Sequence, residues 1–588
     1  MSEKVKLTID GKEVEVNEGI TVLQAAKQIG IDIPTLCFLK DVNQAGECRI
    51  CIVEIEGRRG FVPSCRTIVE EGMKIKTNTI ELNEARRIIL DLILSAHHRD
   101  CLTCVRNGNC ELQALADKFG VTEIHYEGQK EKAFIDEFSP SIVRDNSKCI
   151  MCKRCVATCK NVQKVGAIDV AGRGFHSRIA AENDESLNNV NCTFCGQCIE
   201  ACPVGALKEK DETATVWRKL RDKDTFVVVQ TAPAVRAALG EEFGMPIGTC
   251  VTGKMVTALK RLGFDKVFDT NTGADLTIVE EANELIERLN DKEAVLPMIT
   301  SCSPGWVRYI EMNYPEQLDH LSSCKSPHEM FGSILKSYYA KKMEIDPEKM
   351  YVVSVMPCIA KKFEKVREEL KNDGLANVDS VITTRELARM IKQAHIDLSL
   401  LEDSEFDNPI GEATGAGAIF GTTGGVMEAA LRTAYEKVTG EELKKLEFEE
   451  VRGKEGIKKS TIKMGEKEIK VAVAHGLANA QKILEEIKNG NADYQFVEIM
   501  ACPGGCIMGG GQPIVSSKKR NDIDVRKARA SALYKIDEQS KIRKSHENPY
   551  IKELYEEFLE TPGSYRAHKY LHTTYKKREK YKNWIKWA

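Results

Sequence analysis

Two cysteine runs of identical spacing constrain this chain more than any other feature. The segments CIMCKRCVATC and CTFCGQCIEAC both have the pattern C-x2-C-x2-C-x3-C. This spacing binds four-iron clusters, and in two-cluster proteins the fourth cysteine of each run ligates the other cluster. The sequence therefore predicts one cluster on Cys149, Cys152, Cys155 and Cys202, and a second on Cys192, Cys195, Cys198 and Cys159.

The remaining composition is consistent with an intracellular protein rich in metal ligands. The opening MSEKVKLTIDGKEVEV lacks the apolar core of a signal peptide, and no later apolar run is long enough to span a membrane. We therefore expect a cytoplasmic location, where closely spaced cysteines, of which the chain has 21, ligate metals more often than they pair. With 85 basic and 88 acidic side chains, nothing indicates nucleic acid as a partner. Cys250 and Cys324 belong to no cluster and are expected to be small buried hydrophobic residues.

The N-terminal segment predicts a further cluster unit. KLTIDGKEVEV is typical of a β-hairpin with Asp10 and Gly11 at the turn, and a helix should follow between Thr21 and Gly30. Four cysteines come next, three from a loop and one from a later strand, which suits a two-iron cluster, with zinc as the alternative. They are Cys37, Cys48, Cys51 and Cys65.

A third cysteine group lacks one thiol. HHRDCLTCVRNGNC contains Cys101, Cys104 and Cys110, with His97 four residues before the first cysteine. Imidazole can ligate iron, so His97 would complete a four-ligand set, and His98 is the rival ligand.

After about residue 225 the pattern changes to apolar strands that alternate with amphipathic helices. The segments TFVVVQ, VLPMIT, YVVSVMP, VAVAHG and YQFVEIM predict an α/β domain with largely parallel strands. Cys302, Cys358 and Cys502 come just after three of these strands, and Cys506 follows within the segment ACPGGCIMGGGQP. Because parallel sheets gather ligands at the carboxyl ends of their strands, these loops should converge on one site. The glycines contain no nucleotide-binding motif and would let the backbone approach a bulky metal cofactor closely.

Three segments, TSCSPGW, MPCIAKKFE and EIMACPGGCIMGGGQP, resemble the signature motifs of the iron-only (FeFe) hydrogenases. The cluster segments before them resemble the same family and the large subunit of respiratory NADH dehydrogenases, where the H-x3-C-x2-C-x5-C pattern favours His97 as ligand. The resemblance covers nearly the whole chain and implies a multidomain protein of α/β and α+β units. These are a β-grasp 2Fe-2S domain (1–79), a His/Cys 4Fe-4S domain (80–140), a bacterial two-cluster 4Fe-4S ferredoxin domain (141–212), an α/β catalytic domain with largely parallel sheets (225–515), and a helical segment like the family's small subunit (516–588).

The resemblance also implies the catalytic cofactor, or H-cluster. In the family it is a four-iron cluster joined through a cysteine thiolate to a two-iron unit that carries CO, cyanide and a bridging dithiolate. By motif position Cys358 and Cys502 ligate the four-iron part, Cys506 bridges to the two-iron unit, and Lys361 bonds a cyanide. Further positions that match the family's cofactor cage are Pro233, Ser326, Met356 and Met500.

A proton path is implied in the same way. Its matching positions are Glu281, Glu284, Arg288 and Ser322. Without the resemblance, Glu281 and Glu284, three residues apart on an expected helix, would be interpreted as a solvated helix face.

The first motif departs from the family's familiar form, T-S-C-C-P-x-W, in which the first cysteine passes the proton and the second ligates the four-iron cluster. Here Cys302 is followed by Ser303, and a hydroxyl is a poorer ligand for iron. Either Cys302 ligates, with Ser303 near the proton path, or Ser303 ligates through oxygen, or the site is impaired. The presence of only one thiol favours Cys302 as ligand. His328 also replaces a glutamine of a familiar member.

The predicted function is reversible conversion of protons and electrons into H₂ by one 2Fe-2S cluster, three 4Fe-4S clusters and the H-cluster. The expected partners are ferredoxin, flavin-containing subunits that bind NAD(P)H, or both, together with maturation proteins that build the two-iron unit. A membrane role for the basic C-terminal segment is the alternative to packing on the catalytic domain. A non-catalytic hydrogen sensor or electron-transfer subunit, supported by Ser303 alone, is the alternative function. The related iron–sulfur assembly proteins lack so long a series of clusters.

Overall fold

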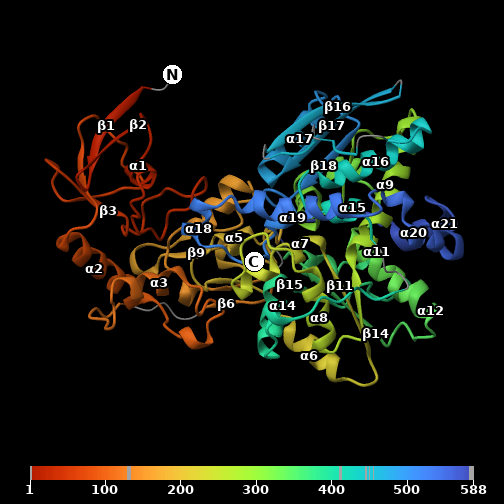
Figure 1. Ribbon diagram of the computed structural model, residues 1–588, viewed down its shortest axis with the longest axis horizontal. Helices are drawn as coiled ribbons and strands as arrows, with labels where there is room; N and C mark the ends of the chain where they lie inside the picture. The colour runs from red at the N-terminus through yellow and green to blue at the C-terminus, as the bar shows by residue number, and fades with distance from the viewer. Residues whose placement is uncertain are drawn as a thin grey trace, which may run out of the picture.

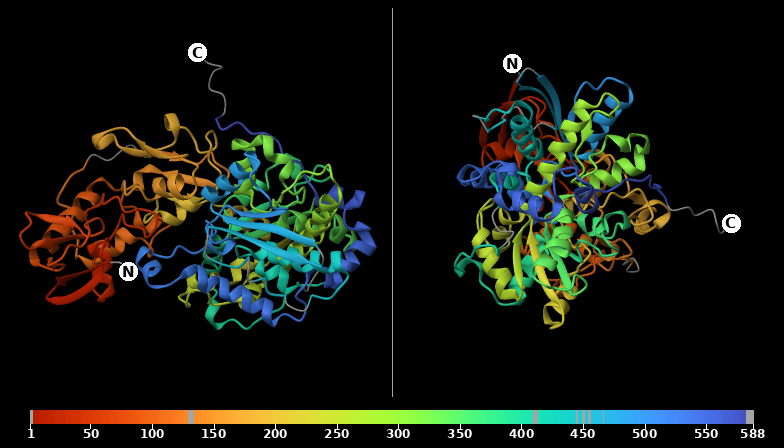
Figure 2. Two further views of the ribbon diagram at one scale, coloured as in Figure 1. Left: turned by 90° about the horizontal axis from the view of Figure 1, so that it is seen from above. Right: turned by 90° about the vertical axis from the view of Figure 1, so that its right-hand side faces the viewer.

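The computed structural model describes residues 3–128, 134–408, 413–443, 446–448, 451–453, 456–465 and 467–581. The N-terminal units form one end of an elongated molecule, and the chain from about residue 225 forms the larger end (Figures 1 and 2). Within these ranges no helix combines the length and the apolar character needed to cross a membrane.

The first unit is a five-stranded sheet with one helix packed on it. The expected hairpin is confirmed as β1 (Lys4–Ile9) and β2 (Lys12–Asn17), with Asp10 and Gly11 at positive φ in the turn. The strand order is β2-β1-β5-β3-β4, with β3 (Ile52–Ile55), β4 (Phe61–Pro63) and β5 (Lys74–Lys76). The expected helix is α1 (Val22–Gln28), which Thr21 and Gln24 open as a reciprocal capping box.

The next two units are built from short elements around the cysteine groups. Residues 80–118 form α2 (Ile80–Ala96), the short helix η1 (Cys101–Thr103) and α3 (Glu111–Lys118). Within the repeated cysteine runs, Cys155 lies on α4 (Arg154–Ala157), Cys159 on η3 (Thr158–Val162) and Cys198 on α5 (Gln197–Ala201), and α4 packs against α5. Their strands are β6 (Ile135–Asp136), β7 (Ile142–Asp145) and β10 (Leu207–Glu209) in one sheet, and β8 (Asp169–Ala171) and β9 (Arg178–Ala180) in another.

The larger end contains two four-stranded sheets. The first has the order β12-β11-β14-β15 and is fully parallel, with β11 (Phe226–Thr231), β12 (Lys266–Asp269), β14 (Met350–Met356) and β15 (Ser380–Thr383). The second has the order β13-β18-β17-β16, with β13 (Met298–Ile299), β18 (Phe496–Met500), β17 (Lys467–His475) and β16 (Ile457–Met464). Only β16 is antiparallel to its neighbour, so the expectation of largely parallel sheets is confirmed.

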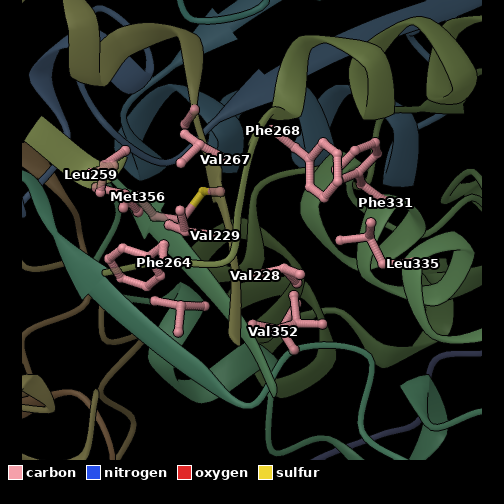
Figure 3. Close-up of a cluster of buried hydrophobic side chains, with 14 of the residues drawn as sticks. Val228, Val229, Leu259, Phe264, Val267, Phe268, Phe331, Leu335, Val352 and Met356 are labelled. Carbon is pink, nitrogen blue, oxygen red and sulfur yellow. The ribbon is translucent and has the colours of Figure 1, made fainter. Parts of the chain in front are cut away.

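Helices cover both sheets and close the core. Figure 3 shows the core of the first sheet, where Val228, Val229 and Val352 pack near Phe268 and Phe331 with almost no exposed surface. The longest helix, α9 (Thr270–Asn290), packs against α11 (Pro327–Ile334) and α16 (Gly425–Thr439). The other helices are α6 (Thr213–Arg221), α7 (Pro233–Arg236), α8 (Thr252–Leu262), α10 (Pro304–Asn313), α12 (Ala340–Lys342), α13 (Lys361–Glu364), α14 (Thr384–Gln393), α15 (Gly415–Ile419) and α17 (Leu477–Lys488).

The C-terminal segment runs along the molecule from the cluster units to the far edge of the larger end (Figure 1). It contains α18 (Ser517–Asp522), α19 (Val525–Gln539), α20 (Pro549–Leu554), the π-helical turn η13 (Tyr555–Leu559) and α21 (Tyr565–Leu571). Near its start Lys518 pairs with Asp32 of the first unit, and near its end α21 packs on α11. The expected helical packing on the catalytic domain is therefore observed; residues 582–588 lie outside the described residues.

The two unassigned cysteines have different surroundings. Cys324 is buried as expected, with 1% of its surface exposed. The expectation for Cys250 is wrong, because Cys250 lies on the exposed loop before α8.

Candidate cluster and catalytic sites

The cysteines of the two repeated runs are grouped across the runs. Cys149, Cys152 and Cys155 line one cavity together with Cys202, the last cysteine of the second run. This cavity encloses about 410 Å³, part of it open to solvent. The structure thus brings together the four thiols that the spacing assigns to one cluster.

The thiols of the complementary group also lie near enough to influence one another's ionisation. Burial raises the pKa of Cys192 to about 12, and the neighbouring thiols Cys159 and Cys195 contribute to the rise. Burial also raises the pKa of Cys198 well above its usual value, with contributions from Cys195, Cys192 and Cys159. Such thiols would stay protonated in the absence of a metal, whereas iron, as a cation, favours the thiolate.

The four N-terminal cysteines form two contacting pairs. The backbone N–H of Cys37 lies 3.3 Å from Cys48 Sγ, and that of Cys48 lies 3.5 Å from Cys37 Sγ. A hydrogen bond to Cys65 lowers the pKa of Cys51 to about 7. Backbone N–H groups directed at sulfur are a common means of stabilising iron–sulfur clusters.

The third group contains both histidine candidates. His97 and His98 line one cavity with Cys101, Cys104 and Cys110. His97 Nδ1 and His98 Nε2 are buried without a hydrogen-bond partner in the described residues. Burial lowers the pKa of His97 to about 4, so its ring is neutral and has a lone pair available for iron. The geometry does not separate the two histidines.

The first cysteine group and the His/Cys group both adjoin the unit that carries the repeated cysteine runs. Asn43 Nδ2 donates to the carbonyls of Cys37 (2.8 Å) and Cys152 (3.1 Å), which ties the first group to the third unit. A Cβ placed on Gly205 would lie 2.5 Å from Cys104 Sγ, so the His/Cys group also adjoins that unit.

The last cysteine group lies against the catalytic unit. Gln197 Nε2 donates to the Met508 carbonyl at 3.0 Å, and Arg308 Nε donates to the Cys192 carbonyl at 2.7 Å. The last cysteine group therefore adjoins the loop that carries Cys502 and Cys506.

The four cysteines predicted to form the catalytic site converge from both sheets of the larger unit. Cys302, Cys358 and Cys502 follow β13, β14 and β18 within three residues, and Cys506 begins the short helix η11 (Cys506–Met508). Burial raises the pKa of Cys502 well above its usual value, and the neighbouring Cys358 and Cys195 add to the effect. Burial and Cys358 likewise raise the pKa of Cys506 to about 12. Three soft thiolate donors thus meet beside the last cluster group, a donor set suited to iron–sulfur chemistry.

The glycine-rich loop is pressed against neighbouring backbone. A Cβ on Gly509 would lie 2.2 Å from the Pro357 carbonyl oxygen, and one on Gly510 would lie 2.7 Å from backbone atoms of Gly196. Any larger residue would push the loop away from β14 and from the cluster unit. Backbone packing therefore accounts for these glycines, in addition to the expected approach to a cofactor.

Lys361 belongs to a buried polar network. Its Nζ donates to Glu364 Oε2 at 2.7 Å and to the Cys302 carbonyl at 3.3 Å. Glu364 also accepts from Ser326 Oγ at 3.0 Å and lies 2.6 Å from His328 Nε2. Burial disfavours the lysine charge, but Glu364 and Cys358 outweigh it and raise the pKa of Lys361.

Sequence reasoning did not identify Glu364, although its place three residues after Lys361 in KKFE was a usable signal. The other expected cage residues also lie at strand ends. Met356 and Met500 end β14 and β18 and are buried, and Pro233 begins α7 directly after β11.

Three of the four expected proton-path residues, Arg288, Glu284 and Ser322, are joined by hydrogen bonds. Ser322 Oγ donates to Glu284 Oε2 at 3.0 Å, and Arg288 Nη2 donates to Glu284 Oε1 at 2.7 Å. Glu281 is fully buried, and its carboxylate oxygens have no hydrogen-bond partner in the described residues. Burial raises the pKa of Glu281 to about 8, Glu284 adds to the rise, and the nearby Ser322 hydroxyl partly offsets it. The solvated face expected without the family resemblance is therefore wrong for Glu281.

Cys302 and Ser303 have different neighbours. Burial raises the pKa of Cys302 well above its usual value, and the charges that add most are Glu281 and Cys506. Ser303 Oγ instead accepts a hydrogen bond from the Ala501 N–H at 3.2 Å, next to Cys502. These surroundings favour Cys302 for the proton path, although the sequence favoured it as the iron ligand.

Comparison with known families gives five matches along the chain. Residues 225–510 match the C-terminal domain of the iron-only hydrogenase large subunit, and residues 523–578 match the iron hydrogenase small subunit. Residues 2–80 match a 2Fe-2S cluster-binding domain. Residues 86–125 match the NADH-ubiquinone oxidoreductase-G iron–sulfur binding region, and residues 139–208 match the ferredoxin-like domain of NADH-quinone oxidoreductase subunit 3.

Individual relatives extend over almost the whole chain. The NADP-reducing hydrogenase subunit HndD of Solidesulfovibrio fructosivorans is 51% identical over 98% of this chain and 99% of its own length. Iron hydrogenase 1 of Clostridium pasteurianum is 44% identical over 97% of this chain and 100% of its own length. Among solved structures, a variant of the FeFe-hydrogenase of Chlamydomonas reinhardtii is 42% identical, with a TM-score of 0.57, and the match covers 63% of this chain and 99% of that chain.

Proposed function

This chain belongs to the iron-only hydrogenase family and is a catalytic subunit with iron–sulfur cluster domains, and we propose that it interconverts protons, electrons and H₂ at the site where β13, β14 and β18 end. The observation that carries the proposal is the convergence of Cys358, Cys502 and Cys506 beside the last cysteine group of the cluster units. When bound there, the H-cluster supplies the iron at which H₂ is formed or cleaved. The residues present fit this group, because they offer three soft sulfur ligands beside a glycine-rich loop whose backbone is closely packed.

The residues of the site would bind the H-cluster and fix its orientation. In this proposal Cys358 and Cys502 would hold the four-iron part, and Cys506 would be the ligand that it shares with the two-iron unit. Lys361, kept charged by Glu364, would donate a hydrogen bond to an anionic ligand of the two-iron unit. Pro233, Ser326, Met356 and Met500 exclude water from the two-iron unit.

Protons reach the site through side chains that connect to the molecular surface. Arg288 and Glu284 retain 17% and 13% of their side-chain surface exposed, so the path begins there. The proton then passes from Glu284 through Ser322 to Glu281, and from Glu281 to the Cys302 thiol. With a pKa near 8, Glu281 holds a proton at neutral pH and can release it, as a relay group must.

We assign Cys302 to this path and Ser303 to the iron-ligand position of the first motif. The charges of Glu281 and Cys506 act on Cys302, whereas the Ser303 hydroxyl lies on the Cys502 side. This assignment keeps the register of the family motif and reverses the preference drawn from the sequence.

With one 2Fe-2S and three 4Fe-4S clusters held by the cysteine groups described, the cluster units would carry electrons to and from the site. The proposed units span 1–79, 80–140, 141–212, 225–515 and 516–588, which the matched ranges support. The two outer groups at the N-terminal end would accept electrons from ferredoxin, from a flavin subunit that binds NAD(P)H, or from both. The name of the NADP-reducing relative supports the second partner. A cytoplasmic location, supported by so many reduced cluster ligands, suits either donor.

The test of the site itself is isotope exchange. Protein loaded with all its clusters is incubated with D₂ in H₂O, and the release of HD is followed by mass spectrometry. The proposal predicts HD without any added electron donor, because cleavage and re-formation of H₂ need only the site and its proton path. A fully loaded protein that forms no HD would contradict it, whereas failure of reduction by ferredoxin alone would concern only the cluster series.

We expect His97, rather than His98, to ligate the 4Fe-4S cluster on Cys101, Cys104 and Cys110. His97→Ala should remove the imidazole ¹⁴N coupling from the pulsed EPR spectrum of that cluster, because the only nitrogen ligand is lost. His98→Ala is the matched control and should keep the coupling. Loss of the coupling in His98→Ala alone would transfer the assignment to His98.

The rate of HD formation should also fall as the pH rises. Because the pKa of Glu281 is raised to about 8, this relay group is protonated at neutral pH and loses its proton as the pH rises through about 8. We expect the HD rate to fall about tenfold per pH unit above this value. The neutral form also contributes stability that is complete below the unfolded pKa, near 4.5, and is lost as pH rises through about 8. An HD rate that stays constant to pH 10 would contradict the assignment of Glu281.

A further inference from the structure

Three potential metal ligands from separate segments meet beside the proton path. Glu284 lies on α9, Cys324 lies three residues before α11, and His572 follows α21 in the C-terminal segment. One carboxylate oxygen, the Cys324 sulfur and one imidazole nitrogen lie within 4.8 Å of one another. Nitrogen, sulfur and oxygen donors in such a group are those that zinc prefers.

His572 is oriented as a metal-binding histidine. Its Nε2 lies 3.0 Å from Oε2 of Glu280, which is fully buried and is itself held by the Tyr555 hydroxyl and the Gly563 N–H. When a carboxylate accepts the Nε2–H, Nδ1 has a lone pair that can bind a metal. Many zinc-binding histidines donate their other ring N–H to a carboxylate in this way. Nδ1 faces Ser323 Oγ at 2.8 Å.

Glu284 has one oxygen turned toward the same point. Arg288 holds Oε1 at 2.7 Å, while Oε2 faces Ser323 Oγ at 3.2 Å and Cys324 Sγ at 3.8 Å. The Ser323 hydroxyl therefore lies between two acceptors, Glu284 Oε2 and His572 Nδ1, and its single hydrogen serves only one of them at a time.

Cys324 completes the group as a protonated thiol. It is 1% exposed, and burial and Glu284 raise its pKa well above the usual value. Zinc binding would release this proton to solvent and leave a zinc-bound thiolate. Glu284 and His572 keep 13% and 6% of their side-chain surfaces exposed, so the group lies close to solvent.

We propose that Glu284 Oε2, Cys324 Sγ and His572 Nδ1 form a binding site for a divalent ion of the zinc type, and that the bound ion blocks proton transfer. The ion displaces the Ser323 hydroxyl from His572 Nδ1 and occupies the oxygen of Glu284 that Ser322 contacts at 3.0 Å. Binding itself depends only on the three ligands. The inhibitory effect rests on the proposed role of Glu284 as a proton relay.

The test uses zinc chloride and the fully loaded enzyme under anaerobic conditions. Zinc retained after gel filtration is measured by mass spectrometry, and its ligands are determined by X-ray absorption at the zinc edge, where iron does not interfere. We expect one zinc per chain with one sulfur neighbour near 2.3 Å and lighter neighbours near 2.0 Å. The D₂ exchange rate should fall about tenfold or more and recover after addition of a chelator.

Three variants separate this site from other thiols. His572→Gln and Cys324→Ala should each abolish both the retention of zinc and the inhibition. Cys324→Ala is a small change that the buried site should accommodate. Cys250→Ala, which removes the exposed cysteine, is the control and should change neither. Iron content is measured throughout.

Distinct outcomes would overturn each half of the proposal. The site would be excluded if the bound zinc had four sulfur neighbours and the protein lost iron. It would also be excluded if Cys324→Ala and His572→Gln retained as much zinc as the unaltered protein. Zinc bound by the expected ligands without any fall in exchange would exclude the inhibition and would count against Glu284 as relay. Absence of exchange before zinc is added would instead contradict the proposed function.

Discussion

Glu281→Gln is expected to lower hydrogen evolution from a chemically reduced viologen by at least about 100-fold, the usual scale for the loss of a proton-transfer group. Glutamine has the shape of glutamic acid but cannot release and regain a proton at this position. Glu281 is fully buried, and its raised pKa identifies it as a group that carries a proton at neutral pH. Iron content and the EPR spectra of the reduced clusters should stay unchanged, because Glu281 is not proposed to ligate iron.

The matched control for this variant is Glu287→Gln. Glu287 lies on the same helix, α9, but is exposed, and its carboxylate accepts a hydrogen bond from the Asn283 side chain at 2.8 Å. This variant should retain nearly full activity. If Glu281→Gln kept more than half of the hydrogen evolution with all clusters loaded, protons would have to enter by another route.

Cys302→Ala is expected to lower hydrogen evolution by about 100- to 10,000-fold without loss of iron. The reason is that Cys302 adjoins Glu281 and Cys506, and in our assignment it passes the proton rather than holding the four-iron cluster. The measurement combines the rate with total iron per chain and the EPR signal of the four-iron part.

Two variants of Ser303 test whether Ser303 or Cys302 ligates the four-iron part. Ser303→Ala should weaken the attachment of the four-iron part, because the proposed oxygen ligand is removed, whereas Ser303→Cys should retain it with a stronger thiolate ligand. If Cys302→Ala lost about four irons and Ser303→Ala lost none, Cys302 would be the ligand, as the single thiol in the motif suggests.

Local spacing made much of this architecture predictable from sequence. The grouping of Cys202 with Cys149, Cys152 and Cys155 follows from a repeat whose pattern is chemically specific, and the structure brings these thiols into one cavity. The hairpin around Asp10 and the strands before the catalytic cysteines were predictable for the same reason, since turn chemistry and apolar runs are local signals.

Long-range packing produced what the sequence did not predict. A glutamate on an amphipathic helix is usually exposed to solvent. Here α9 packs against α11 and α16, and Glu281 is buried. The approach of His572 to Glu280 joins residues 292 positions apart, and no local pattern indicates it. The exposure of Cys250 likewise depends on a loop between packed elements, not on the residue type.

The central claim, that this site makes hydrogen with electrons from the cluster series, is tested most directly by hydrogen evolution from reduced viologen. The assay is run without oxygen on protein whose two-iron unit and clusters are shown to be present by iron analysis and infrared bands of CO and cyanide. We predict sustained evolution that disappears in Cys506→Ala, because Cys506 is the proposed bridge to the two-iron unit. A fully loaded protein that evolves no hydrogen would contradict the account and would favour a sensor or an electron-transfer subunit with this fold.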